Sequence, residues 1–194
     1  IDSGPIGNHG ATLGLSDEDW RPGRLHNGLT FKPQQRSLVV VGAHASLNPS
    51  RAVSVALWVN ARSWQGRPCL LEKGDDFQEY GLGIRQNQLQ FFVRLNEGQT
   101  VRATAPLPRV NEWTHIAAIY DGQAAFLLVD GELLRSARAA GHPAAAHHDL
   151  TIGGRRSGNA TAEDFFAGMI DEVLLYARAL SLEEVRSLAA GKAP

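Results

Sequence analysis

The sequence predicts an all-β domain of antiparallel strands that is closed by one short C-terminal helix. Several runs alternate their side chains between two faces, as strands do, and residues 52–60 are one of them. Asp121-Gly122 and Asp130-Gly131 separate apolar runs and predict tight hairpins, because both residue types tolerate positive φ. Near the end of the chain, Ser181 is followed three residues later by Glu184, which predicts the capped start of a helix.

The first half of the chain predicts a loop followed by two strands. Residues 1–14 are rich in Gly, Asn and Asp, which is the composition of a turn-rich loop. A short strand is expected at residues 38–41 and a longer one at residues 52–60. Trp58, in the longer strand, could be a platform on which a sugar stacks, but a large aromatic in mid-strand is more often packed in the core. The other face of this strand carries an apolar row made of Val53, Val55, Leu57 and Val59.

A hairpin is expected over residues 80–95, with its turn near Gln86-Asn87. One row of its second strand is apolar, whereas the other combines amides, an aromatic ring and a guanidinium. Such a row offers a polyol both hydrogen bonds and a flat apolar surface. The alternative is an ordinary solvated sheet face with one exposed phenylalanine, which is normal for antiparallel sheets. The candidate ligand-binding residues in this row are Gln88, Gln90, Phe92 and Arg94.

The last third of the chain predicts a three-stranded meander and a final strand that runs into the helix. His115 falls in the apolar row of the meander, so it is interpreted as a buried, hydrogen-bonded histidine rather than a catalytic one. Residues 169–176 alternate strictly between two faces. The helix is expected to begin at Leu182 and to stop near Gly191. Its apolar stripe consists of Leu182, Val185, Leu188 and Ala189.

Composition excludes several classes of partner. Nineteen basic and twenty acidic residues nearly cancel, which removes the electrostatic argument for nucleic acid or an anionic membrane. The longest apolar runs are far shorter than the ~20 residues that span a bilayer, so no membrane insertion is expected. Cys69 is alone, which excludes an internal disulfide and a cysteine-based zinc cluster, and it is interpreted as a small buried side chain.

The length of 194 residues suits one domain, residues 1–194. The chain begins at Ile1 without a methionine or a charged-then-apolar leader, and is therefore interpreted as a piece excised from a larger protein.

Short motifs in a fixed order identify a family. Residues 166–185 read F-A-G-M-I-D-E-V-L-L-Y-A-R-A-L-S-L-E-E-V, and they are preceded by L-L-E-K-G, W-T-H-I-A, Y-D-G, V-D-G-E-L and L-T-I-G-G. This series closely resembles the laminin G-like jelly rolls of the concanavalin A-like lectin/glucanase superfamily. The resemblance implies a two-sheet antiparallel β-sandwich with one short C-terminal helix, and an extracellular, cell-surface or periplasmic location.

The resemblance also implies a structural calcium ion. Residues 1–14 are similar to a family loop that supplies oxygen ligands together with the Asp of I-D-E-V, which makes Asp2, Asn8 and Asp171 the candidate ligands here. Hard oxygen ligands on a loop suit calcium. The alternative is that Asp2 and Asn8 cap turns and that Asp171 accepts backbone N–H bonds. One departure from the family is Lys32, which stands where relatives carry an acid.

A second set of candidate binding residues comes from loops at the rim of the sandwich. Residues 155–163 occupy the position of a variable rim loop in relatives, and loops on rigid sandwiches often hold binding residues. The exposed recognition candidates are Trp64, Arg155, Arg156 and Asn159.

Three functions remain open on the sequence. The first is a noncatalytic, lectin-like carbohydrate-binding module of a larger exported or surface protein. The alternative is a protein-interaction or spacer domain without a glycan ligand, so the expected partners are a glycan, another protein and other domains of the parent chain. A glycoside hydrolase ranks third, because it needs two carboxylates across a cleft and the glucanase strand E-x-D-x-x-E is absent. We therefore expect no enzymatic activity.

Overall fold

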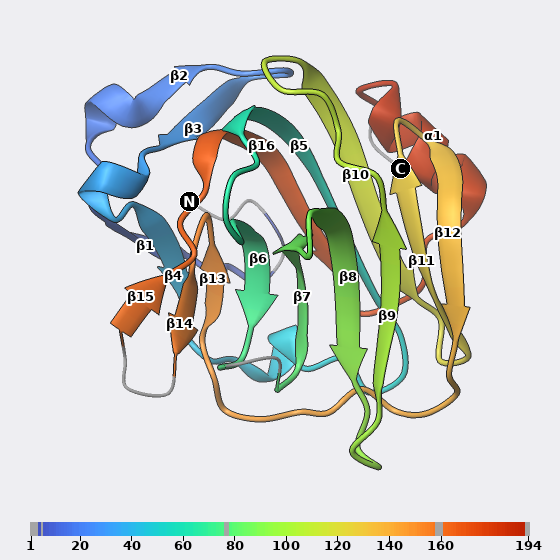
Figure 1. The fold of residues 1–194 in the computed structure, drawn as a ribbon. Helices are drawn as coiled ribbons and strands as arrows, with labels where there is room; N and C mark the ends of the chain where they lie inside the picture. The colour runs from blue at the N-terminus through green and yellow to red at the C-terminus, as the bar shows by residue number, and fades with distance from the viewer. Residues whose placement is uncertain (1–3, 5, 76–77, 158–160, 193–194) are drawn as a thin grey trace.

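The protein is an antiparallel β-sandwich of two large sheets (Figure 1), seen in a computed structural model that describes residues 4, 6–75, 78–157 and 161–192. In these ranges each of the two large sheets has seven strands, and all strand pairs in them are antiparallel. The expected two-sheet sandwich is confirmed.

We call the first sheet sheet A. Its strands, in spatial order, are β1 (Gly10–Leu13), β4 (Leu38–Val41), β13 (Leu150–Ile152), β6 (Cys69–Lys73), β7 (Tyr80–Arg85), β8 (Gln88–Arg94) and β9 (Thr100–Ala105). A separate two-stranded ribbon consists of β14 (Arg155–Ser157) and β15 (Thr161–Glu163).

We call the second sheet sheet B. Its strands, in spatial order, are β12 (Glu132–Arg138), β11 (Ala124–Val129), β10 (Trp113–Tyr120), β5 (Val53–Ser63), β16 (Ala167–Tyr176), β3 (Asn27–Phe31) and β2 (Trp20–Pro22). Within the described residues, the helical elements are three short 3₁₀ turns, η1 (Asp17–Asp19), η2 (Pro33–Gln35) and η3 (Ala45–Leu47), and one α-helix, α1 (Leu182–Ala189).

The core lies between the two sheets and follows the period-2 pattern of the strands. The predicted row of β5 is confirmed, because Val53, Val55, Leu57 and Val59 are all buried in this cluster. From sheet A, Leu89, Phe91 and Val93 of β8 enter the same cluster. Side chains at the alternate positions of β8 must therefore point away from sheet B.

The predicted hairpins are confirmed. The β7–β8 turn falls at Gln86 and Asn87, both with positive φ, as a two-residue turn of the favoured twist requires. The β10–β11–β12 meander turns at 121–123 and 130–131.

A β-bulge in β16 contradicts the strict alternation expected for residues 169–176. The register against β5 shifts between Asp171 and Leu174, and Glu172 has a φ of 49°. Ile170 and Val173 therefore face the same core, although they are separated by an odd number of positions. The extra residue of a bulge reverses the parity of a strand, which periodicity alone does not reveal.

Helix α1 covers the outer face of sheet B, and its predicted start is confirmed. Ser181 Oγ accepts the N–H of Glu184 at 3.2 Å, and the Ser181 N–H donates to the Glu184 carboxylate at 2.7 Å. Val185 and Leu188 pack with apolar residues of β5, β10 and β11 in a second buried cluster. The expected stripe is wrong at Leu182, which is 41% exposed and does not join this cluster.

A buried ion pair anchors the long connection between β12 and β13. The ammonium of Lys73 lies 3.1 and 3.0 Å from the two carboxylate oxygens of Glu79, and both side chains are buried. Lys73 also donates to the carbonyl oxygens of Ala146 and His148 at 3.2 and 2.7 Å. A buried charge is tolerated when it is paired and hydrogen-bonded in this way.

Candidate functional site

The outer face of sheet A, which points away from sheet B, carries the polar row predicted from the sequence. Gln88 and Arg94 are exposed there, and Arg94 donates to the Thr100 hydroxyl at 3.2 Å. Strand β9 pairs with β8 so that Arg102 lies directly across from Phe92. In the described part of the chain, Arg102 makes no ion pair, so its guanidinium is available to solvent and ligands.

Phe92 is buried, which corrects the expectation of an exposed aromatic platform. It is only 3% exposed, although it lies on the outer face. Its partner across the ladder is Gly81, and a Cβ atom at Gly81 would come within 2.6 Å of the Phe92 ring. The ring therefore lies over the backbone of β7 at Gly81, where a side chain would exclude it. Gln90 is also largely covered, with 9% of its surface exposed.

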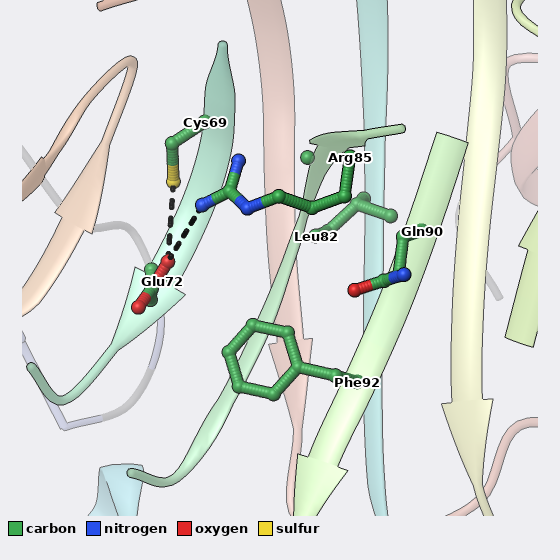
Figure 2. Close-up of a pocket in the computed structure, with 7 residues that line it drawn as sticks. Cys69, Glu72, Leu82, Arg85, Gln90 and Phe92 are labelled. Carbon is green, nitrogen blue, oxygen red and sulfur yellow. Dashed lines mark hydrogen bonds and ion pairs between the residues drawn. The ribbon is translucent and has the colours of Figure 1, made fainter. Parts of the chain in front are cut away.

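Around Gln90 and Phe92 the outer face contains a small niche of about 10 Å³, the size of one water molecule. Figure 2 shows Arg85 reaching across toward Cys69 and Glu72, with Phe92 below it and the Gln90 amide entering from β8. The niche is lined by Cys69, Glu72, Leu82, Gly83, Arg85, Gln90 and Phe92.

The polar groups of the niche are held by one another. The Glu72 carboxylate lies 3.9 Å from the Arg85 guanidinium and 3.9 Å from the Cys69 sulfur. Burial, with the nearby Glu72 charge as a second cause, raises the pKa of the Cys69 thiol well above its ordinary value. Cys69 is therefore a neutral thiol that can donate a weak hydrogen bond, rather than a thiolate nucleophile.

Arg155 belongs to a charge network beside this niche rather than to an exposed recognition loop. It is 4% exposed and donates to Asp164 at 2.7 Å. Asp164 also lies 3.5 Å from Arg67 and 3.5 Å from Arg85, so three guanidinium groups share one carboxylate. This network pins the β14–β15 ribbon, and the expected exposure of Arg155 is wrong.

Two of the remaining loop candidates are also engaged within the protein: Trp64 is buried and Arg156 is paired. Trp64 is buried at 7% exposure, its ring packs on Phe166, and its indole N–H donates to the Pro108 carbonyl at 2.8 Å. Arg156 is half-buried and pairs with Asp149. Asn159 lies outside the described residues.

The two candidate calcium ligands that the structure describes, Asn8 and Asp171, bond to different partners. The Asp171 carboxylate accepts backbone N–H groups from Arg24, Leu25 and Glu172 at 2.8, 3.0 and 2.9 Å. A cation there would face these N–H donors, so the surroundings of Asp171 do not fit calcium. Asn8 instead exchanges hydrogen bonds with Ser46 in η3.

Asp2 lies outside the described residues. Within the described ranges, no three His, Cys, Asp or Glu side chains are grouped as metal ligands would be.

Sequence reasoning missed Glu72 and Arg85, the two charged residues of the niche. A signal was present, because Glu72 stands between Leu71 and Lys73 in a strand with buried residues on both faces. A carboxylate in such a strand requires a partner on the outer face, and the end of the next strand supplies Arg85.

His115 and Trp58 are paired across β10 and β5, and their rings contact each other on the outer side of sheet B. The Trp58 ring is covered by the Arg24 guanidinium, 4.7 Å from its centroid, which confirms packing rather than a sugar platform. His115 contacts Trp58 edge-on and is buried as expected, but its Nδ1 has no hydrogen-bond partner among the described residues. The expectation of a hydrogen-bonded imidazole is thus not met at that nitrogen.

None of the helices in the described part of the chain is long and apolar enough to cross a membrane.

Comparison with solved structures shows the same fold in binding domains of bacterial proteins and in a pentraxin. The binding domain of Paraclostridial Mosquitocidal Protein 1 is 16% identical, with a TM-score of 0.75 over 98% of this chain and 50% of that one. The binding domain of Botulinum Neurotoxin DC in complex with SialylT is 13% identical, with a TM-score of 0.71 over 96% of this chain and 47% of that one. This chain thus spans about half the length of these toxin domains.

A native heptameric SAP-like pentraxin from Limulus polyphemus is 14% identical, with a TM-score of 0.60 over 78% of this chain and 75% of that one. A search of curated protein sequences found no significant match. A laminin G-like family described as the concanavalin A-like lectin/glucanases superfamily matches residues 34–186. The chain therefore belongs to this family, as a laminin G-like member of the concanavalin A-like lectin/glucanase superfamily.

Proposed function

We propose that the protein is a noncatalytic glycan-binding module that recognises sugar through the outer face of sheet A. The observation that carries the proposal is the niche, where a carboxylate, a guanidinium, an amide and an aromatic ring surround a space for one oxygen atom. A sugar hydroxyl is both a donor and an acceptor. Glu72 offers it an acceptor and Gln90 offers it both functions.

The exposed residues around the niche extend the proposed site. Gln88, Arg94 and Arg102 stand on the same face of β8 and β9 and are exposed. Arg102 lies across from Phe92 and diagonal to Arg94, which is close enough for both guanidinium groups to act on one ligand, whereas Gln88 lies at the other end of β8. They would hold the part of a saccharide that remains outside the niche, so recognition depends on this polar row rather than on aromatic stacking.

Several findings support a binding role over catalysis. The carboxylates nearest the niche, Glu72 and Asp164, both pair with Arg85, and Glu72 is buried. A glycosidase needs two carboxylates that flank an open cleft. The solved structures of the same fold include binding domains of toxins, one of them in complex with SialylT.

We further propose that the module works outside the cell or in the periplasm as part of a longer chain, as family membership favours. A calcium ion bound by Asp2, which lies outside the described residues, remains a proposal, and Asp171 is not part of it.

A glycan panel would test the proposed site. The wild-type domain, Gln88→Ala/Arg94→Ala and Gln90→Met would be applied to immobilised glycans, with calcium and with chelator. We expect the wild type to bind, the double variant to bind at least about tenfold more weakly, and the niche variant to lose affinity for the same glycans. Glu183→Ala, an exposed change on α1, is the matched control and should bind as the wild type does.

Circular dichroism melting would show that each variant is folded. Failure of the folded wild type to bind any glycan, with or without calcium, would overturn the proposal. Equal binding by all variants would move the site away from sheet A.

A protein partner is the second candidate, and one observation favours it. Leu133 and Leu134 are 51% and 40% exposed on β12, which is an edge strand of sheet B. An edge strand with exposed apolar residues can accept another chain. Leu133→Ser/Leu134→Ser should leave glycan binding unchanged and should weaken any captured protein partner, measured by pull-down with the wild-type and variant domains.

A further inference from the structure

A second, larger hollow lies where three connections of the sandwich meet. Its volume is about 310 Å³, which is at the lower end of the range for small-molecule sites. One wall is Arg51, just before β5; another is the β10–β11 turn with Gly122 and Gln123. The third wall is Gly141 and His142. These last two belong to the connection from β12 to β13, which runs along the bottom of Figure 1. We call this hollow the end cleft, and it shares no residue with the niche.

The walls of the end cleft are held in place by hydrogen bonds to the main chain. The Gly141 N–H donates to the Gly122 carbonyl at 3.2 Å, which ties the third wall to the second. The Tyr120 hydroxyl lies 2.9 Å from the carbonyl oxygens of both Ala139 and Gly141. The Asp121 carboxylate accepts the N–H of Gln123 at 2.7 Å and so fixes the turn. A ligand would therefore meet walls that are already ordered, which lowers the entropic cost of binding.

His142 is oriented by its contact with the main chain. Its Nδ1 lies 2.9 Å from the Ser50 carbonyl oxygen. A carbonyl oxygen can only accept, so Nδ1 carries the proton in this contact. The other nitrogen of the neutral ring, Nε2, is then an acceptor and can receive the proton of a ligand hydroxyl.

Arg51 brings a guanidinium to the same cleft. Its backbone and stem lie close to Gly122, because a Cβ atom at Gly122 would be 3.3 Å from the Arg51 carbonyl oxygen and 3.5 Å from its Cγ. Gly122 has a φ of 94°, which also favours glycine at this position. In the part of the chain that the structure describes, Arg51 makes no ion pair, and it is exposed.

We infer that the end cleft binds a sugar that carries one carboxylate, such as a uronic acid. A guanidinium matches a carboxylate through two parallel hydrogen bonds. With the carboxylate on Arg51, ring hydroxyls can donate to His142 Nε2 and bond to the Gln123 amide. The inference rests on the proposed glycan-binding function for the class of ligand, but on none of the residues of sheet A.

Glu97 limits the charge that this ligand carries. Its carboxylate lies beyond Gly141, where a Cβ atom built on that glycine would be 3.1 Å from Glu97 Oε2, and it does not line the cleft. A nearby negative charge opposes a second anionic group at this end. The cleft therefore suits a single carboxylate at the Arg51 end rather than a polysulfated chain.

The test compares two sugars that differ only in the carboxylate. Methyl β-glucuronide and methyl β-glucoside would be titrated into the ¹⁵N-labelled domain while amide chemical shifts are followed. We expect saturable shifts at Gly122, Gln123, Gly141 and His142 with the glucuronide, and affinity at least about tenfold lower for the glucoside. Equal affinities for both sugars, or no saturable shift with the glucuronide, would overturn the inference.

Two variants with opposite expected effects on glucuronide affinity sharpen the test. Arg51→Ala should weaken glucuronide binding by about tenfold or more and leave the weak glucoside binding unchanged. Glu97→Gln should strengthen glucuronide binding by about two- to threefold, because it removes a repelling charge. Arg62→Ala, an exposed arginine on β5, is the matched control and should change neither affinity. An equal loss of glucuronide affinity in Arg62→Ala would show that the effect comes from the overall charge of the protein, and would refute the site.

The Gln90→Met variant separates this inference from the proposed function. It should bind the glucuronide in the end cleft with unchanged affinity. If no panel glycan binds sheet A while the glucuronide still requires Arg51, the proposed site fails and the end cleft stands. If the panel binds through sheet A and Arg51→Ala has no effect, the end cleft fails alone.

Discussion

The two outer faces of the sandwich differ in what covers them. On sheet B, α1 lies over an apolar cluster, and Arg24 covers Trp58. On sheet A, the middle of the outer face carries charged and amide side chains, and the Phe92 ring packs over Gly81. One face is closed by the chain itself and the other meets solvent with polar groups. Binding residues are therefore expected on sheet A, and the largest costs of substitution or protonation on sheet B.

Acid should destabilise the covered face through His115. Burial lowers the pKa of His115 to about 4 from its ordinary 6.5, although the charge of Asp130 opposes this. Between these values the unfolded chain binds a proton at His115 that the folded protein does not, so stability falls as pH falls from 6.5 to 4. At about pH 4, where His115 is fully protonated in the unfolded chain, this difference lowers the unfolding free energy by about 3 kcal/mol.

Urea unfolding of the wild type and of His115→Phe, from pH 7.5 to 4.5, would measure this effect. The difference between the two proteins isolates His115 from other titrating groups. The variant should lose less stability on acidification, and parallel pH profiles would contradict the assignment.

Truncation of the helix contact should cost more than truncation on the open face. Leu188→Ala removes buried methyl groups between α1 and sheet B and should lower the unfolding free energy by about 2 to 3 kcal/mol. Gln88→Ala on sheet A is exposed and should change it by less than about 0.5 kcal/mol. Denaturant midpoints for the two variants give the comparison, and similar costs would show that α1 adds little to the sandwich.

A methyl group at Gly81 should disturb the aromatic part of the open face. Gly81→Ala places a Cβ atom 2.6 Å from Phe92 and 3.1 Å from the Leu71 carbonyl oxygen, so the ring must move. We expect a loss of about 1 to 2 kcal/mol in thermal or urea unfolding, together with a changed niche. Gly42→Ala is the control, because nothing lies within 4 Å of a Cβ atom there. A neutral Gly81→Ala would mean that Phe92 is not held by close packing.

Much of the architecture could be predicted from neighbouring residues. The β7–β8 turn, the apolar row of β5 and the cap of α1 each depend on residues within a few positions of one another, and all three are confirmed. The family series was also readable, since its motifs are short and ordered, and the family match confirms it.

The sites were less readable, because exposure depends on strands that are distant in sequence. Phe92 is covered since Gly81 faces it across the ladder, and Trp64 is buried against Phe166, 102 positions further along the chain. The sequence predicted an exposed Arg155 in a rim loop, but the β14–β15 ribbon brings the carboxylates of Glu163 and Asp164 to its guanidinium. The bulge in β16 reversed a parity that period-2 reasoning assumed.

By itself, the sequence determined the fold class, the hairpin turns and the helix start, because local torsional preferences and periodic burial act between near neighbours. The tertiary structure alone decided which polar residues are buried and which are exposed. It brought Glu72 to Arg85 and it opened the end cleft at Arg51, because both depend on how separate segments meet in space.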